Sequence, residues 1–131
     1  MDVRRITTPA VAELPGATWT NALRIGEEIV MSGMTAHPAA PEGAYEQALK
    51  VLAKLLACVE AAGGGKRNFY KLVIYVTDIA HKDEVGRARR DFFQAPYPCS
   101  TLVEVKGLVF PELKVEIDAW ARLDVDLSRC V

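Results

Sequence analysis

The stretch that decides the fold is residues 97–122, YPCSTLVEVKGLVFPELKVEIDAWAR. Two runs within it, Ser100–Val105 and Lys114–Leu123, are rich in β-forming residues, and we predict that they are strands joined by a turn around Gly107 and Pro111. Successive side chains of a strand point to opposite faces, so the second run has an apolar face and a polar one. The apolar face carries Val115, Ile117, Ala119 and Ala121, and the other carries Glu116, Asp118, Trp120 and Arg122.

The first run of this pair alternates in the same way. Ser100, Leu102 and Glu104 alternate with Thr101, Val103 and Val105. We predict that Glu104 shares a face with Glu116 and Asp118, which gives that face three carboxylates beside Trp120. Such a mixture is unusual for a surface that only meets water. Any chemistry is therefore expected to depend on what meets this carboxylate-bearing face.

Upstream of the pair, the chain carries four more predicted strands and two predicted helices. A stripe of apolar residues at three- and four-residue steps predicts a helix from about Ala44 to Ala62. The three glycines at 63–65 follow it, and we interpret them as a helix terminus because no complete phosphate-loop motif surrounds them. The other elements are a helix, Asp83–Phe93, and the strands Val3–Thr7, Thr18–Ile25, Glu28–Thr35 and Phe69–Thr77.

The resulting order, β-β-β-α-β-α-β-β, predicts one α+β domain over residues 1–131 with a six-stranded mixed sheet. Strand–helix–strand crossovers are right-handed, so both helices are expected on the same face. No element is left for the opposite face, which must hold some of Val73, Tyr75, Leu102 and Trp120. That is too much apolar surface to leave in water, so we expect the chain to associate with copies of itself.

The composition gives no reason to expect a polyanionic partner. Half of the residues are apolar, and 16 basic residues are offset by 17 acidic ones. The basic cluster of Arg87, Arg89 and Arg90 is typical of one solvated helix face. We therefore expect no nucleic acid and no membrane as a partner, and no apolar run reaches transmembrane length.

The cysteines and histidines favour neither a disulfide framework nor a metal site. Cys58, Cys99 and Cys130 are odd in number and widely spaced, and His37 and His81 lie far apart in the sequence. We expect no metal and no other cofactor. Free thiols, and an N-terminus without the apolar core of a signal peptide, predict a cytoplasmic protein.

Four segments resemble the Rid (YjgF) family in their order and spacing. They are WTNALRIGEEIVMSGM from Trp19, YEQALKVLAKLLACVEAAG from Tyr45, YKLVIYVTDIA from Tyr70, and YPCSTLVEV with KVEIDAWA in the stretch quoted first. The resemblance covers about Thr18 to Leu123. It implies a homotrimer of chorismate-mutase-like domains, with sheets facing inward and small-molecule sites in the clefts between subunits. The best-known members hydrolyse reactive enamines and imines, such as 2-aminoacrylate, to keto acids and ammonia.

The resemblance also implies which residues form the site. Glu116 matches the catalytic glutamate that positions the water, and Gly33 matches a glycine whose backbone lines the pocket. At three further positions that bind substrate in the family, this chain has a different residue type. Trp19 stands where the family has a tyrosine, Gly86 where it has an asparagine, and Leu102 where it has a cysteine.

Ser100 stands where the family has the arginine that clamps the substrate carboxylate. A serine cannot replace a guanidinium, which offers paired planar donors and a fixed charge, and losing such a contact costs about 2–5 kcal/mol. Arg24 and Arg87 are the candidates for a substitute cation. We expect a less charged pocket beside the apolar segment Val109–Pro111, and weak activity on imines that carry a carboxylate.

Three functions remain open at this point. The first is a divergent Rid enzyme that hydrolyses a small imine or enamine, with Glu116 as its catalytic carboxylate. The second is a non-catalytic trimer that binds a small ligand or a protein partner, in which Glu116 is only a strand or interface carboxylate. The third is the ribonuclease activity sometimes attributed to the family, against which the charge balance argues. Ser100 is not expected to be a nucleophile, since no histidine or G-x-S-x-G motif accompanies it.

Overall fold

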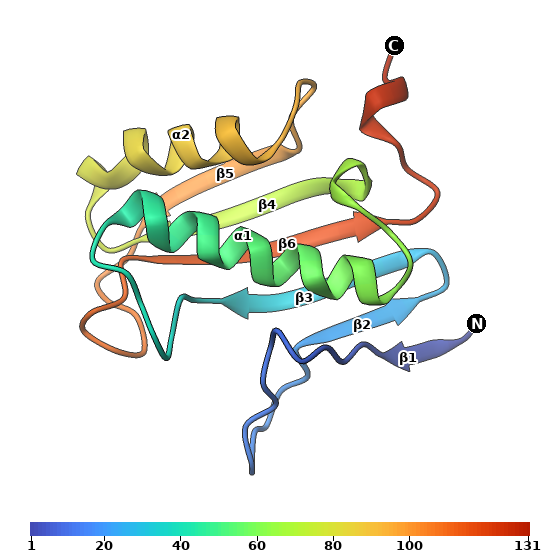
Figure 1. Cartoon of the computed structure of the whole chain (residues 1–131), viewed down its shortest axis with the longest axis horizontal. Coiled ribbons are helices and arrows are strands. Elements are labelled where there is room, and N and C mark those ends of the chain that lie inside the picture. The colour runs from blue at the N-terminus through green and yellow to red at the C-terminus, as the bar shows by residue number, and fades with distance from the viewer.

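Six strands form a single sheet with two helices in front of it, in a computed structural model that describes all 131 residues (Figure 1). The order across the sheet is β1-β2-β3-β6-β4-β5; β4 and β5 are parallel and the other neighbours are antiparallel. This confirms the predicted order and the mixed sheet. The elements are β1 Val3–Arg5, β2 Ala22–Ile25, β3 Glu28–Met34, α1 Ala44–Ala61, β4 Phe69–Val76, α2 Lys82–Phe92, β5 Cys99–Glu104 and β6 Val115–Arg122, with short 3₁₀ turns at Lys66–Asn68, Ile79–His81 and Leu127–Arg129.

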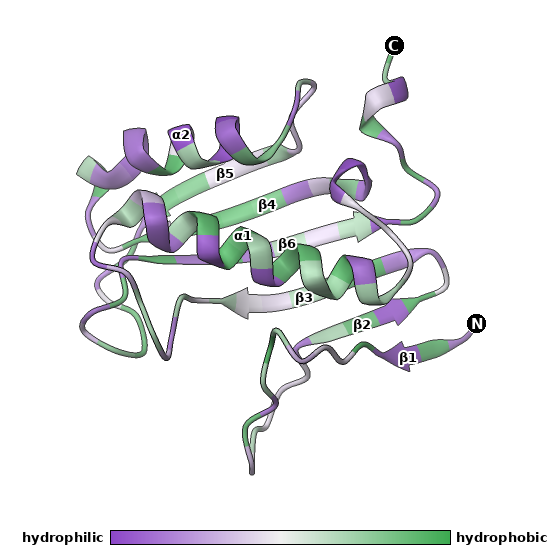
Figure 2. Cartoon of the chain, in the orientation of Figure 1, coloured by the Kyte–Doolittle hydropathy of each residue, from purple (hydrophilic) through white to green (hydrophobic).

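Both helices cover one face of the sheet, as the right-handed crossovers predict (Figure 1). The apolar stripe of α1 packs on the central strands β6 and β3, and Val51, Leu52 and Leu55 have no exposed surface. Polar residues line the other side of α1, and α2 is the more hydrophilic helix (Figure 2). Neither helix has the length and hydropathy needed to cross a lipid bilayer.

The glycines after α1 end that helix, as predicted. Gly63 has φ of +95°, a left-handed conformation that glycine adopts without steric cost. Its backbone N–H donates to the carbonyl of Glu60, and the N–H of Gly64 donates to that of Val59. The glycines therefore satisfy the last carbonyls of a helix.

Gln47 is a buried polar residue of α1 that fastens two loops at one end of the sheet. Its Nε2 donates to the carbonyls of Pro41 (2.8 Å) and Glu112 (3.0 Å), and its Oε1 accepts from the backbone N–H of Lys114 (2.8 Å). Every polar atom of this amide is therefore paired away from water. The contacts fix the segment that leads into β6 and so set where Glu116 lies.

The second face of the sheet has no intrachain cover. Buried and half-buried residues alternate without exception along β6, so Glu116, Asp118 and Trp120 share this open face. Tyr75 lies directly opposite Glu116 on β4, and Val73 lies opposite Asp118. The prediction that this face holds some of Val73, Tyr75, Leu102 and Trp120 is confirmed for all of them except Leu102.

The facing of β5 differs from the prediction. Leu102 pairs in register with Ile74, which is fully buried beneath the helices, so Ser100, Leu102 and Glu104 lie on the helix face. Val103 pairs with Tyr75 and lies on the open face, 41% exposed. Placing Glu104 with Glu116 and Asp118 was therefore wrong. Both faces of this edge strand mix polar and apolar residues, so its alternation does not reveal which face meets the helices.

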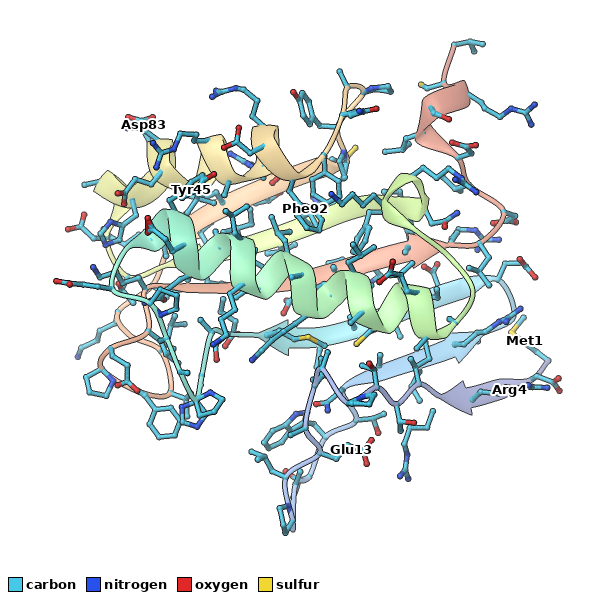
Figure 3. All side chains as sticks on the ribbon, in the orientation of Figure 1. Met1, Arg4, Glu13, Tyr45, Asp83 and Phe92 are labelled. Carbon is cyan, nitrogen blue, oxygen red and sulfur yellow. The ribbon has the colours of Figure 1, made fainter.

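The second strand also begins later than predicted, at Ala22 instead of Thr18. Side-chain hydrogen bonds hold the preceding residues as a loop. Asn21 donates through Nδ2 to the carbonyl of Ala12, and the Oγ of Ser32 donates to the carbonyl of Thr20. Trp19 is therefore on a loop, where it lines one hollow together with Glu13. Figure 3 labels Glu13 in the part of this loop that extends from the sheet.

Candidate functional site

Gly33 and two carboxylates of β6 meet on the open face. The pairing of β3 with β6 is irregular between Met31 and Met34, and Gly33 lies within that irregularity. A Cβ at Gly33 would lie 2.6 Å from Oε2 of Glu116 and 2.7 Å from Oδ1 of Asp118. Only a glycine leaves both carboxyl groups where they are, and the backbone of Gly33 is exposed beside them.

The environment of Glu116 favours its protonated form. Burial raises the pKa of Glu116, and the neighbouring charge of Asp118 raises it further. Asp118 is itself held by Tyr75, whose hydroxyl donates to Oδ2 at 2.8 Å. That hydrogen bond is also the main reason why the pKa of Tyr75 is raised. The open face thus offers one fixed carboxylate and one carboxyl with a shifted proton affinity.

A second group of predicted site residues lies between α2 and β5, on the helix face. Gly86 of α2 and Ser100 of β5 line one groove with a volume of about 290 Å³. Leu102 and Gly86 line the adjoining groove further along α2. The first groove has no acidic residue in its lining, which is completed by Leu72, Arg89, Arg90, Phe93, Tyr97 and Pro98.

Arg89 supplies a cation next to Ser100. Its Nη1 donates to Oγ of Ser100 at 2.6 Å. The two substitute cations that the sequence suggested lie elsewhere: Arg24 binds the carbonyl of Gly26 and pairs with Glu27, and Arg87 stacks over the ring of Tyr45 at 4.0 Å. The cation next to Ser100 is therefore neither of the two arginines named as candidates, but a residue of α2 whose long side chain reaches β5.

The remaining predicted residues are divided between the flanking loops. Trp19 is 55% exposed and lines a separate hollow with Arg5 and Glu13, and Glu116 is not part of that lining. In the apolar segment Val109–Pro111, the ring of Phe110 stacks on His37 with ring centroids 4.3 Å apart. No group of three or more histidine, cysteine, aspartate or glutamate residues is placed to hold a metal ion.

The predicted site residues therefore fall on opposite faces of one sheet. Gly33 and Glu116 lie on the open face, whereas Gly86, Ser100 and Leu102 lie on the helix face beside α2. The strand β4 separates β6 from β5, so the sheet itself stands between the two groups. A single chain cannot bring them into one cavity.

Comparison with known proteins identifies the family. The family model described as endoribonuclease L-PSP matches residues 10–123. The chain belongs to this family. The resemblance to Rid (YjgF) proteins, which are the same family, is thereby confirmed. A RutC family protein of Aquifex aeolicus is 30% identical to the chain over 124 residues, which is 89% of this chain and 98% of that protein.

This L-PSP family chain also resembles a deaminase in sequence and a protein of unknown function in structure. A 2-iminobutanoate/2-iminopropanoate deaminase of Capra hircus is 28% identical over 124 residues, covering 91% of this chain and 90% of that protein. The crystal structure of a protein of unknown function from Pseudomonas aeruginosa superposes with a TM-score of 0.95, at 59% identity and 99% coverage of both chains. The fold predicted from the sequence is thereby confirmed.

Two residues of the candidate site were missed in the sequence. Arg89 is three residues after Gly86 on a helix, a spacing that places both on one face, and this signal could have selected it from the basic cluster. Tyr75 could not have been found in the same way, because its contact with Asp118 depends on the register of β4 against β6.

Proposed function

We propose that this chain is a Rid-type hydrolase that converts a small imine or enamine to a carbonyl compound and ammonia. The observation that carries the proposal is the half-buried carboxyl of Glu116, which lies against the bare backbone of Gly33 and beside Asp118. Similarity to a deaminase of 2-imino acids supports the reaction type.

The chemistry needs a group that first takes and then returns a proton. The substrate enters as the protonated imine, C=NH2+, and Glu116 in its carboxylate form accepts a proton from water as the water oxygen bonds to the C=N carbon, which leaves a neutral amino group on the adduct. Glu116 then gives this proton to the amino nitrogen, and the C–N bond breaks with release of ammonia. The hydroxyl proton of the adduct passes to Glu116 as C=O forms, and from there to solvent. The raised pKa of Glu116 suits these transfers, because an effective acid–base group has a pKa closer to the working pH.

We also propose that the working cleft lies between two copies of the chain in a homotrimer. The two groups of site residues occupy opposite faces, so a cleft with both needs the open face of one copy and the α2–β5 edge of the next. Burial of the open face, where Val103 is 41% exposed, would stabilise such a ring. Light scattering at micromolar concentration tests this assembly, and a stable folded monomer would contradict it.

The three cysteines form no disulfide, which supports a reducing compartment such as the cytoplasm as the place where the protein acts.

The decisive experiment replaces Glu116 by glutamine, which keeps its size and removes its proton exchange. An amino-acid oxidase supplies 2-iminobutanoate, and the release of keto acid is followed. Glu116→Gln should lower turnover by about 10²–10⁴-fold and leave the trimer intact. A variant that retains wild-type turnover would refute the proposed role. If the variant loses the trimer, Glu116 is an interface residue, and the non-catalytic binding function becomes the better interpretation.

A further inference from the structure

Arg89 is half-buried and has no carboxylate partner, which distinguishes it from the other arginines of the chain. Of the three half-buried arginines, Arg24 and Arg122 form ion pairs and Arg89 forms none. Burial lowers the pKa of Arg89, yet an arginine stays charged at neutral pH. A desolvated cation without an acidic partner is costly, and an anion that enters the groove would offset this cost.

The guanidinium of Arg89 lies between the two smallest residues of its groove. Its Nη1 donates to Oγ of Ser100 at 2.6 Å, and its Nη2 lies 3.6 Å from the position that a Cβ of Gly86 would occupy. At these two positions the Rid resemblance would have placed an arginine and an asparagine. Both side chains are shortened here, and the guanidinium of a third residue fills the space between them.

The hydrogen bond to Ser100 uses one N–H donor of the Arg89 guanidinium and leaves the others free to bind a ligand. A guanidinium has five N–H donors, and the guanidinium of Arg89 makes no other hydrogen bond in the structure. The serine hydroxyl limits the rotation of a long side chain, which lowers the entropy lost when a ligand binds. No acidic side chain lines the groove, and Arg90 adds a second positive charge to it.

We propose that Arg89, oriented by Ser100, is the anion-binding residue of this site and takes a carboxylate or a similar planar oxyanion of the substrate. Paired donors in one plane match the two oxygens of such a group. The inference rests on the proposed function for the identity of the site and deepens it by naming the group that the substrate carries. It reverses the expectation that carboxylate-bearing imines are poor substrates.

The test measures binding, so that it does not depend on turnover. The full-length protein is titrated calorimetrically with 2-oxobutanoate and with its uncharged match of nearly the same shape, 2-oxobutanamide. The wild type should favour the carboxylate by at least about tenfold. Arg89→Ala should weaken carboxylate binding by about thirty-fold or more and leave binding of the amide unchanged. Arg89→Lys should restore part of the loss, because a lysine keeps the charge without the planar fork.

Two variants separate the role of Arg89 from general effects. Arg87→Ala removes a neighbouring arginine of α2 that stacks on Tyr45, and binding of both probes should stay at the wild-type level. Ser100→Ala keeps the guanidinium but frees it, and should weaken binding of the carboxylate alone by a few-fold. Ser100 acts here as a positioning residue.

Three results would overturn the assignment. They are a wild type that fails to bind the carboxylate, a wild type without preference for it over the amide, and an Arg89→Ala variant that keeps the preference. The test is separate from that of the hydrolysis: a chain that binds 2-oxobutanoate through Arg89 but turns over no imine would sink the proposed reaction and leave the role of Arg89 standing.

Discussion

Replacement of Gly33 by alanine tests the geometry of the open-face group most directly. The new Cβ would lie 2.6 Å from Oε2 of Glu116 and 2.7 Å from Oδ1 of Asp118. An ordinary contact begins at 3.4 Å, so the two oxygens must retreat by about 0.8 and 0.7 Å. Both are ends of flexible side chains, so their displacement should cost only about 0.5–1.5 kcal/mol of stability. A misplacement approaching 1 Å, however, can lower catalysis about a hundredfold.

The Gly33→Ala experiment therefore compares two quantities. Hydrolysis of enzymatically generated 2-iminobutanoate should fall by about 10²-fold, whereas the free energy of unfolding in urea should fall by no more than about 1.5 kcal/mol. Gly65→Ala is the matched control, because no atom lies within 4 Å of a Cβ there and its φ of −156° suits any residue. Wild-type turnover in a Gly33→Ala variant would refute the placement of the chemistry at Glu116.

Three further predictions concern named side chains. Burial raises the pKa of Glu116 in the folded chain above its value in the unfolded chain. Between these two pKa values the folded chain binds more protons, so its stability falls as the pH rises. Glu116→Gln should therefore stabilise the fold more at about pH 7 than at about pH 4, as measured by urea unfolding. The acidic limb of kcat/KM should have its midpoint above the ordinary pKa of a glutamate, and a midpoint at the ordinary value would argue against Glu116 as the titrating base. Gln47→Leu should lower the free energy of unfolding by about 2–4 kcal/mol, because two carbonyls and the N–H of Lys114 lose their partner; a loss below 0.5 kcal/mol would mean that water replaces the amide.

The elements that sequence reasoning predicted well are those with one strongly preferred face. In β6 every second residue is buried, and α1 carries a continuous apolar stripe, so the period of each pattern reveals both the element and its buried side. The uncovered sheet face followed from the same reasoning, since the chain offers only two helices and both crossovers have the same hand.

The parts that could not be predicted depend on weak patterns or on side-chain reach. In β5, apolar and polar residues occur on both faces, and only its pairing with β4 shows that Leu102 meets the helices and Val103 does not. Gly33 and Glu116 could be assigned by their match to a known family, but the family pattern carried no information on Arg89. The side chain of Arg89 extends from α2 to Ser100 on β5, and the spacing of residues along β5 does not reveal a contact with another element.

The division of the candidate site between two faces has a consequence for mixtures of defective chains. In the proposed trimer each cleft takes Glu116 from one chain and Arg89 from the next, so a Glu116→Gln chain and an Arg89→Ala chain each lack a different half. Any ring that contains both kinds of chain has one cleft in which both halves are intact. Random co-assembly of equal amounts should therefore recover about one quarter of the wild-type activity, measured at low substrate concentration, from two parents that are each strongly impaired. The two substitutions complement each other because each proposed cleft combines residues of two chains.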